Sequence, residues 1–208
     1  MNRFTRLILL LISFLLSGCG TFSPRSDPSR FFTLTAITQP GATATQDSSD
    51  PGGVSLGIGP IRLPGYLDRQ EIVTRIPQNR IDVSENDRWA EPLETNFTRV
   101  LAQNLSVLLH THRLVFFPWE LNRSPAYQVE VEVHRFEANA GGDVHLSARW
   151  AVLDTNKKIP LKSGETVLTR QPAMKSTDTS VAALSETVAD LSREIANSII
   201  AADGQRKP

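Results

Sequence analysis

The sequence predicts an α/β or α+β protein: a single layered domain with a mixed, largely antiparallel sheet and two main helices packed on it. Two segments, 127–136 and 144–152, alternate apolar and polar residues as half-buried strands do. Two others, 93–108 and 181–199, repeat apolar residues at steps of three and four, as amphipathic helices do. The length of 208 residues, with 40% hydrophobic and 21% charged residues, suits one globular domain.

The first nineteen residues predict the compartment. Arg3 and Arg6 precede the apolar run Leu7–Leu16, which is too short to span a bilayer and has the length of a signal-peptide core. The sequence Leu16-Ser17-Gly18-Cys19 follows and resembles a bacterial lipobox. The resemblance implies cleavage between Gly18 and Cys19 and attachment of acyl chains at Cys19. The alternative is an ordinary signal peptide with an incidental cysteine.

The rest of the chain is predicted to be a periplasmic domain on a lipid anchor. The signal segment holds two arginines and no acidic residue, so the remaining 190 residues have a formal charge of −2, which argues against a nucleic-acid partner. They contain no second apolar run long enough to cross a membrane. With Cys19 acylated they have no free thiol, which suits an oxidising compartment. Gly20 stands where enteric-type sorting places aspartate for inner-membrane retention, so we expect the outer membrane.

Four regions are expected along the chain. They are a signal peptide (1–18), a flexible tether (19–30), the folded domain (31–203) and a frayed tail (204–208). The tether is rich in serine, proline and glycine, and it spans at most about 40 Å. Segment 39–53 is small, polar and interrupted by proline, which predicts a mobile loop inside the domain.

The first half of the domain is predicted to contain short strands and one helix. The strands are expected at 31–37, 54–61, 71–76, 80–84 and 114–117, and a loop at 87–91 leads to the helix. Pro92 suits the first turn of that helix, whose apolar stripe is formed by Leu93, Phe97, Val100, Leu101, Leu105 and Leu108. Gly57 and Gly59 leave one face of their strand bare, which predicts a close backbone neighbour.

The second half is predicted to be a long hairpin, a further strand at 164–170 and a closing helix. Tyr127, Val129, Val131 and Val133 face one side, and Phe136 breaks that parity, which predicts a bulge near Arg135. Thr177 or Thr179 is predicted to cap the closing helix. Its apolar stripe is Val181, Leu184, Val188, Leu191, Ile195 and Ile199, and we expect Ser185, Asp190, Arg193 and Glu194 to face away from it.

The sequence carries no recognisable catalytic motif, and we expect no enzyme activity, no cofactor and no metal. It lacks a G-x-S-x-G elbow, a glycine-rich phosphate loop and an H-E-x-x-H helix. His110 and His112 lie two residues apart, but no third ligand is evident beside them. Glu130 and Glu132 repeat at strand spacing, and a solvated strand face is favoured over acid–base work by this pair.

The segment between Arg62 and Trp89 holds the candidate partner surface. Large apolar residues lie there in a predicted loop, and charged residues stand beside them. The candidate residues are Arg62, Leu63, Tyr66, Asp68, Arg69, Arg88 and Trp89. Trp, Tyr and Arg dominate binding hot spots. The alternative is internal bracing, in which the arginines pair with aspartates and Trp89 covers the first helix.

These residues also carry a resemblance to a known family. Phe31-Phe32-Thr33-Leu34 after the tether, Ile58–Pro64, Tyr66-Leu67-Asp68-Arg69, Ile72–Arg75 and above all Asp87–Leu93 resemble the ABC-type transport auxiliary lipoproteins, also called the paraquat-inducible protein C type. The similarity covers nearly all of the chain after the tether. No catalytic motif is transferred with it.

The resemblance implies a non-enzymatic, outer-membrane-anchored docking subunit of an MCE-type phospholipid transport system. Its partner would be a periplasmic protein built from MCE domains, and a ring-shaped conduit would suit a homo-oligomer of this chain. One alternative is a lipoprotein that itself binds a lipid or another apolar ligand in an internal cavity. A periplasmic hydrolase is the third and least supported alternative, since no nucleophile–base pair is visible.

The lipobox gives a direct prediction for Cys19→Ser. Serine cannot form the thioether, so we expect this variant to stay unprocessed and to leave the outer-membrane fraction, because the acyl chains supply about 0.8 kcal/mol of membrane affinity per buried methylene. Envelope fractionation beside the unchanged chain checks this. Normal processing and outer-membrane recovery of Cys19→Ser would contradict the lipid anchor.

Overall fold

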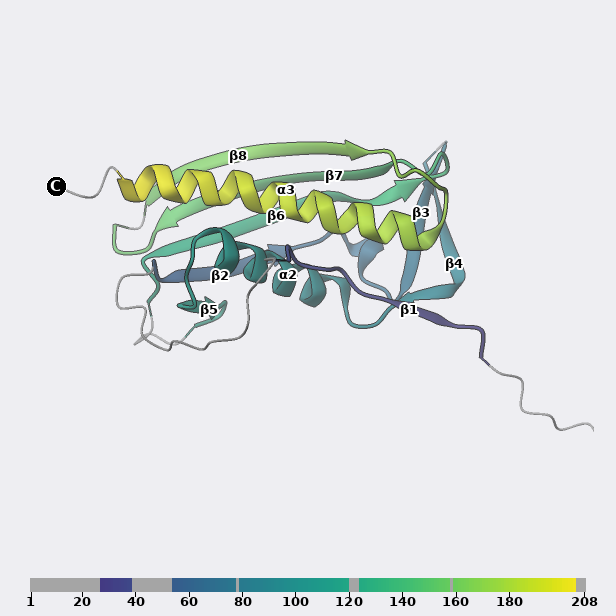
Figure 1. The fold of residues 1–208 in the computed structure, drawn as a ribbon, viewed down its shortest axis with the longest axis horizontal. Helices are drawn as coiled ribbons and strands as arrows, with labels where there is room; N and C mark the ends of the chain where they lie inside the picture. Colours follow the sequence, from purple (N-terminus) through teal and green to yellow (C-terminus); the bar gives the residue numbers. More distant parts are fainter. Residues whose placement is uncertain (1–26, 39–53, 78, 120–123, 158, 205–208) are drawn as a thin grey trace, which may run out of the picture.

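A computed structural model of the chain describes residues 27–38, 54–77, 79–119, 124–157 and 159–204. The predicted signal peptide, Cys19, most of the tether and the loop at 39–53 therefore lie outside the described residues. The elements are β1 (Arg30–Phe32), β2 (Leu56–Arg62), the short 3₁₀ turn η1 (Gly65–Leu67), β3 (Glu71–Ile76), β4 (Arg80–Trp89), α2 (Leu93–Leu108), β5 (Leu114–Phe116), β6 (Tyr127–Asn139), β7 (Val144–Asp154), β8 (Ile159–Arg170) and α3 (Thr177–Gly204) (Figure 1).

The strands form one mixed sheet of eight strands, and the predicted fold class is confirmed. β6 is its centre: it pairs antiparallel with β7 on one side and parallel with β2 and β3 on the other. β8 extends the sheet beyond β7, and β4 joins β3 to β1. The long ladders are antiparallel. β2 and β3 occupy opposite ends of the same edge of β6, so the sheet forks between them.

The long hairpin has the predicted alternation and the predicted bulge. Tyr127, Val129, Val131 and Val133 are buried, and the β6–β7 register shifts between Val133 and Arg135. After that shift Phe136 returns to the core and is 1% exposed. The extra residue explains how two buried runs of opposite parity share one strand.

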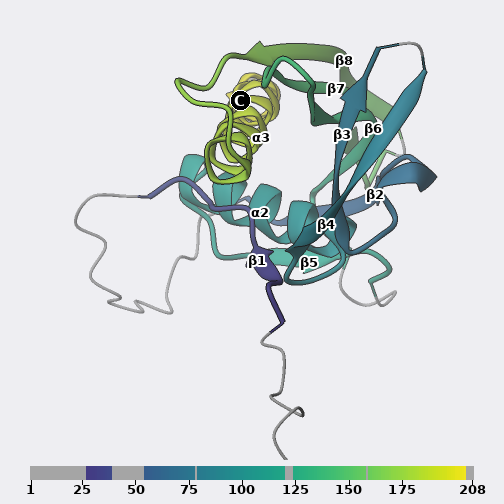
Figure 2. The same ribbon diagram turned by 90° about the vertical axis from the view of Figure 1, so that its right-hand side faces the viewer.

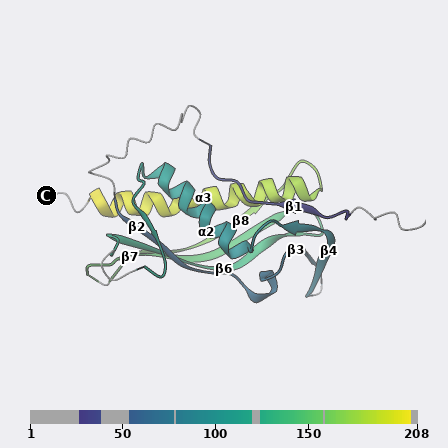
Figure 3. The ribbon, with the colours of Figure 1, turned by 90° about the horizontal axis from the view of Figure 1, so that it is seen from below.

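Both helices lie on the same face of the sheet (Figures 1 and 3). α3 runs along β6, β7 and β8, and α2 packs between α3 and β2. Pro92 directly precedes α2, and the ring of Phe97 meets that of Phe136 edge-on, with centroids 5.3 Å apart. The two apolar stripes meet the hairpin and form one core.

The strand predicted at 31–37 is shorter than expected, because only Arg30–Phe32 pairs with another strand. The following residues lie against α2 and α3, whose polar side chains take the place of a neighbouring strand. Leu34 N donates to Asn96 Oδ1 (3.0 Å), Thr35 N to Ser185 Oγ (3.1 Å) and Ile37 N to Asn104 Oδ1 (2.8 Å). The expectation that Ser185 faces away from the core is therefore wrong, and the residue is 5% exposed.

The prediction of a loop at 87–91 is also wrong for its first three residues. Asp87, Arg88 and Trp89 end the ten-residue strand β4, where they pair in parallel with Arg30, Phe31 and Phe32. The sequence favours a loop because charged residues dominate it. β1 nevertheless pairs with this end of β4 and provides its backbone hydrogen-bond partners. Figure 2 shows β4 extending from β1 to its hairpin with β3.

Gly57 and Gly59 have close neighbours, as expected, although the neighbours are side chains rather than backbone. A Cβ on Gly57 would lie 2.6 Å from Pro125 and 2.8 Å from Trp119. Gly59 has a φ of +107°, and its missing Cβ faces Phe117. These glycines let the segment around Phe117 and Trp119 lie directly on β2.

The contacts of Asn104 predict a specific loss of stability. Asn104 is fully buried, accepts from Ile37 N and donates to Ser192 Oγ (3.1 Å). We expect Asn104→Leu to cost about 1–3 kcal/mol in the free energy of unfolding, because a buried N–H and a hydroxyl lose a partner at nearly unchanged volume. Urea denaturation measures the change.

Gln103→Leu is the matched control, since Gln103 is exposed on the same helix. It should change the free energy of unfolding by no more than about 0.5 kcal/mol. Equal losses for the two variants would show that the amide bonds to the segment after β1 do not stabilise the fold.

Candidate functional site

The seven residues of the predicted partner surface divide into exposed and structural ones. Arg62 ends β2, and Asp68 and Arg69 follow η1; these three side chains are exposed. Leu63 and Tyr66 are half-buried and pack against the core. Arg88 and Trp89 stand at the end of β4.

Trp89 belongs to the core, as the bracing alternative allowed. It is 4% exposed, and together with Leu93, Phe136 and Val181 it lines a cavity of about 250 Å³ between β3, β6 and the start of α3. Its backbone N–H donates to Gln70 O (2.6 Å), which ties the connection after η1 to the end of β4. Any effect of Trp89 on a partner therefore acts through the position of its neighbours.

Arg88 points to the other side of β4. Its Cα pairs with those of Phe31 on β1 and Glu71 on β3, and Phe31 is 65% exposed. The Nε of Arg88 is buried and has no hydrogen-bond partner within the described part of the chain. Arg88 is thus half-buried. Its replacement would disturb the pairing of β4 with β1 and β3 as well as any partner surface that it contributes to.

Tyr66 connects η1 to β6 through a hydrogen bond to the buried carboxylate of Glu137. Its hydroxyl donates to Glu137 Oε2 (2.7 Å), while Arg75 Nε and Arg135 Nε donate to Glu137 Oε1 at 2.7 and 3.1 Å. The backbone N–H of Phe136 donates to Glu137 Oε2 at 3.0 Å. The guanidinium of Arg75 also lies 5.3 Å from the centre of the Tyr66 ring. The side chain of Glu137 is fully buried, so these contacts replace its hydration.

The protonation states of this cluster follow from burial and hydrogen bonding. Burial, and then the bond to Glu137, raise the pKa of Tyr66 to about 12. Burial alone would raise the pKa of Glu137, but hydrogen bonds from Arg75, Tyr66, the Phe136 N–H and Arg135 bring the pKa below its usual value. At neutral pH Glu137 is therefore ionised and Tyr66 is a neutral donor. The cluster braces the loop that presents Asp68 and Arg69.

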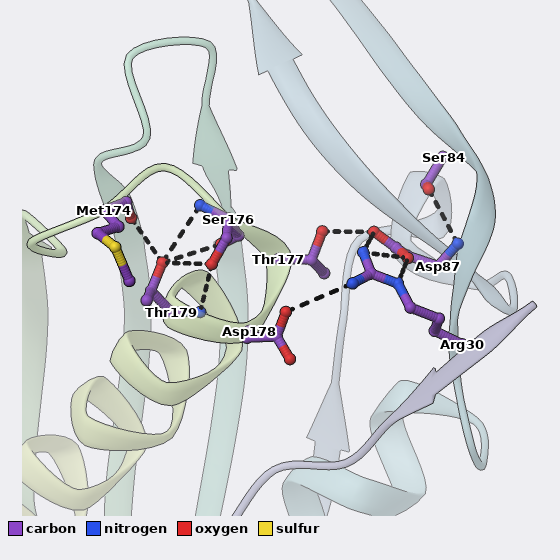
Figure 4. A network of polar contacts seen from close by, with 8 residues as sticks. All are labelled: Arg30, Ser84, Asp87, Met174, Ser176, Thr177, Asp178 and Thr179. Carbon is purple, nitrogen blue, oxygen red and sulfur yellow. Dashed lines mark hydrogen bonds and ion pairs between the residues drawn. The ribbon is translucent and has the colours of Figure 1, made fainter.

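A second polar network surrounds Arg30 at the start of β1 (Figure 4). Arg30 makes a two-pronged contact with Asp87, with Nε–Oδ1 at 2.8 Å and Nη2–Oδ2 at 2.9 Å. Thr177 at the start of α3 donates its hydroxyl to the same carboxylate. Asp178 lies 3.5 Å from Arg30 Nη1, and Asp87 N donates to Ser84 Oγ at 3.0 Å. The network joins β1, β4 and α3, and Asp87 is 8% exposed.

Within the described ranges there is neither a metal-binding cluster nor a membrane-spanning helix. Among those residues no three His, Cys, Asp or Glu side chains are grouped so that they could hold a metal ion. No helix in the same ranges is long and apolar enough to span a bilayer.

The family assignment follows from comparison with known proteins. The profile of the ABC-type transport auxiliary lipoprotein component family matches residues 32–196. The chain belongs to this family. The match begins at the last residue of β1 and ends within α3, so it includes Asp87, the Glu137 cluster and the whole hairpin, while Arg30 lies just before it. The resemblance seen in the sequence is confirmed, and the family is that of a transport auxiliary lipoprotein.

Solved structures share the fold of this family member. A crystal structure of an uncharacterized protein is 20% identical, with a TM-score of 0.66, covering 82% of this chain and 98% of the other. A DUF330 protein from Xanthomonas campestris is 14% identical, with a TM-score of 0.68, covering 86% of this chain and 100% of the other. At these identities the likeness shows the fold alone. A search of curated proteins gave no match.

The Glu137 cluster gives a pH-dependent prediction. Tyr66→Phe removes one donor to a buried charge, and we expect it to lower the free energy of unfolding by about 1–2 kcal/mol at pH 7. The folded-state pKa of Glu137 lies below its unfolded value, so its stabilisation is present above the unfolded pKa and is lost as pH falls through the folded pKa. The effect of Tyr66→Phe should therefore shrink in acid, as urea denaturation at several pH values would show.

A double-mutant cycle with Glu137→Gln supplies the control. In the Glu137→Gln chain, Tyr66→Phe should cost less at pH 7, and its cost should no longer depend on acid pH. A full cost in that background would mean that the hydroxyl acts through some other contact.

Proposed function

We propose that this protein is a non-enzymatic docking subunit of an MCE-type intermembrane phospholipid transport system, anchored to the outer membrane by acylated Cys19 and facing the periplasm. The family match over residues 32–196 carries the proposal, since that family is auxiliary to an ABC-type transporter. Moving phospholipid across an aqueous gap requires a shielded apolar path, and that path must dock at the receiving membrane. Envelope integrity would depend on this docking.

The lipobox and the Asp87 network support the anchored geometry. From Cys19 to Arg30 the chain spans at most about 40 Å. Arg30 is then fixed to Asp87, so the docking surface stays within tens of ångströms of the bilayer. Such tethering raises the effective concentration of the surface, and individual contacts with a partner need not be strong.

The exposed part of the predicted surface is the proposed contact with the MCE-domain partner. Arg62, Asp68 and Arg69 present charge to solvent. Leu63, Tyr66 and Trp89 hold the same segment in place through the core, and Tyr66 also through the Glu137 cluster, while Arg88 pairs with Glu71 through the backbone. A surface that is fixed before binding loses less conformational entropy when the partner docks. A homo-oligomer facing a ring-shaped conduit remains part of this proposal.

The half-open cavity beside Trp89 is too small for the alternative in which the protein encloses a whole lipid. Its volume is about 250 Å³, below the roughly 300–1,000 Å³ of most ligand pockets. Trp89, Phe136 and Leu93 close its inner wall. A phospholipid with two acyl chains needs more room than this.

A charge swap tests the docking surface at constant net charge. We expect Asp68→Lys with Arg69→Glu to weaken binding of the MCE-domain partner at least about tenfold, because reversed charges at a contact surface repel. Pull-down from solubilised envelopes, followed by titration of the purified partner, measures the change.

The matched control is Arg80→Glu with Asp82→Lys, since both residues are exposed on β4. This control should bind the partner as the unchanged chain does. Full binding by a folded Asp68→Lys, Arg69→Glu variant would exclude this surface, and absence of any MCE-domain partner in the pull-down would overturn the proposed function.

A further inference from the structure

The outer face of the sheet carries a row of alternating charges. Arg62 on β2, Glu132 on β6, Arg149 on β7 and Glu165 on β8 are successive partners across the sheet. The residues before or after them in each strand, such as Val131 and Trp150, are buried against the helices. The four charged side chains therefore point away from α2 and α3, toward the opposite side of the sheet (Figure 3).

These four charges are not neutralised by one another. Arg62, Glu132, Arg149 and Glu165 are all exposed, and none of them makes an ion pair or a hydrogen bond with the described part of the chain. Opposite charges on neighbouring strands usually come close enough to pair. Here no two of them form an ion pair, and all four line an open hollow.

The hollow has a volume of about 420 Å³ and borders the charged row. Beside Glu132, Arg149 and Glu165, the next row holds Glu130, Ala151 and Ser163. The small side chains of Ala151 and Ser163 leave the room that the longer ones surround. Gln128 donates from Nε2 to Glu130 Oε1 and to Gly59 O, both at 2.9 Å, and so fixes one carboxylate at the edge of the hollow.

We propose that this hollow binds a phosphoethanolamine group, with the phosphate on Arg149 and the ammonium on Glu130 and Glu132. Guanidinium groups bind phosphate oxygens with two parallel hydrogen bonds, and an ammonium offers three donors to carboxylates. Two carbon atoms separate the ester oxygen from the nitrogen in this group, so its charges lie about one strand spacing apart, roughly 4.8 Å. The alternation of the row has the same spacing.

The composition of the hollow favours a zwitterion over a single ion. A phosphate alone would meet the carboxylates that flank Arg149 on both sides, and a cation alone would meet Arg62 and Arg149. A trimethylated ammonium has no N–H to donate, so a phosphocholine group should bind less well. This inference rests on the proposed function for its biological source, because a phospholipid headgroup delivered by the transport system and a free phosphodiester share this chemistry.

Titration of the full mature chain in detergent with glycerophosphoethanolamine tests the site. We expect saturable binding, weakened at least about tenfold by Arg149→Gln and by Glu132→Gln, since each loses a charge-assisted contact. Glycerophosphocholine, glycerol phosphate and ethanolamine should each bind more weakly. The matched controls are Arg80→Gln and Glu85→Gln on the exposed part of β4, which should bind as the unchanged chain does.

A second experiment uses intact lipid and distinguishes a phospholipid headgroup from a free phosphodiester as the ligand. Phosphatidylethanolamine added to the micelles should be retained in native mass spectrometry by the unchanged chain and lost from Arg149→Gln. Retention of the soluble headgroup but not of the lipid would identify a free phosphodiester as the ligand, and the site itself would stand. Thermal unfolding of each variant confirms that it is folded.

Several outcomes would overturn the site. They are no saturable binding of glycerophosphoethanolamine, equal affinity for ethanolamine or glycerol phosphate alone, and unchanged binding by both variants. Loss of the MCE-domain partner from Arg149→Gln without any headgroup binding would make this face a protein contact instead. Docking through Asp68 and Arg69 is measured separately, so failure of the headgroup site leaves the docking proposal intact.

Discussion

The carboxylate of Asp87 holds together three segments that are distant in the sequence. It receives two hydrogen bonds from Arg30 on β1 and one from Thr177 at the start of α3, while its own strand pairs with β3. A nearly buried charge without such partners would be costly, so each segment is needed for the others to stay in place. One side chain therefore links the start of β1, the end of β4 and the start of α3.

The segment that follows β1 is likewise held by polar side chains from distant parts of the sequence. An extended segment beyond the edge of a sheet would leave its N–H groups unpaired, and buried N–H groups require partners. Asn96 and Asn104 on α2 and Ser185 on α3 meet this requirement. Because both helices contribute, the segment after the tether also fixes α2 relative to α3. The proposed membrane anchor would therefore act on a segment that is bonded to the sheet and to both helices.

The sequence predicted the periodic parts of the fold well and the polar junctions poorly. Alternation in β6 and β7, the bulge before Phe136 and both helical stripes are local patterns of apolar residues, and they follow from burial alone. Asn96, Asn104 and Ser185 were missed because polar residues on a helix suggest solvent; their position within the apolar stripes was the available signal. Glu137 was missed because its partners, Tyr66 and Arg75, come from another strand and a loop. Asp87 was assigned to a loop because its pairing partner is a three-residue strand 57 residues earlier.

Buried and exposed charged residues have different roles in this domain. Glu137 and Asp87 are enclosed and fully bonded, so they fix backbone and offer nothing to a partner. Asp68 and Arg69, and on the sheet Arg62, Glu132 and Arg149, remain without partners in the described part of the chain and are free to bind. The first group makes the second rigid: η1 is held by Tyr66, and the outer face is held by the hairpin and the helices behind it. The backbone that carries these side chains is fixed before binding, so only the side chains themselves lose conformational freedom when a partner docks.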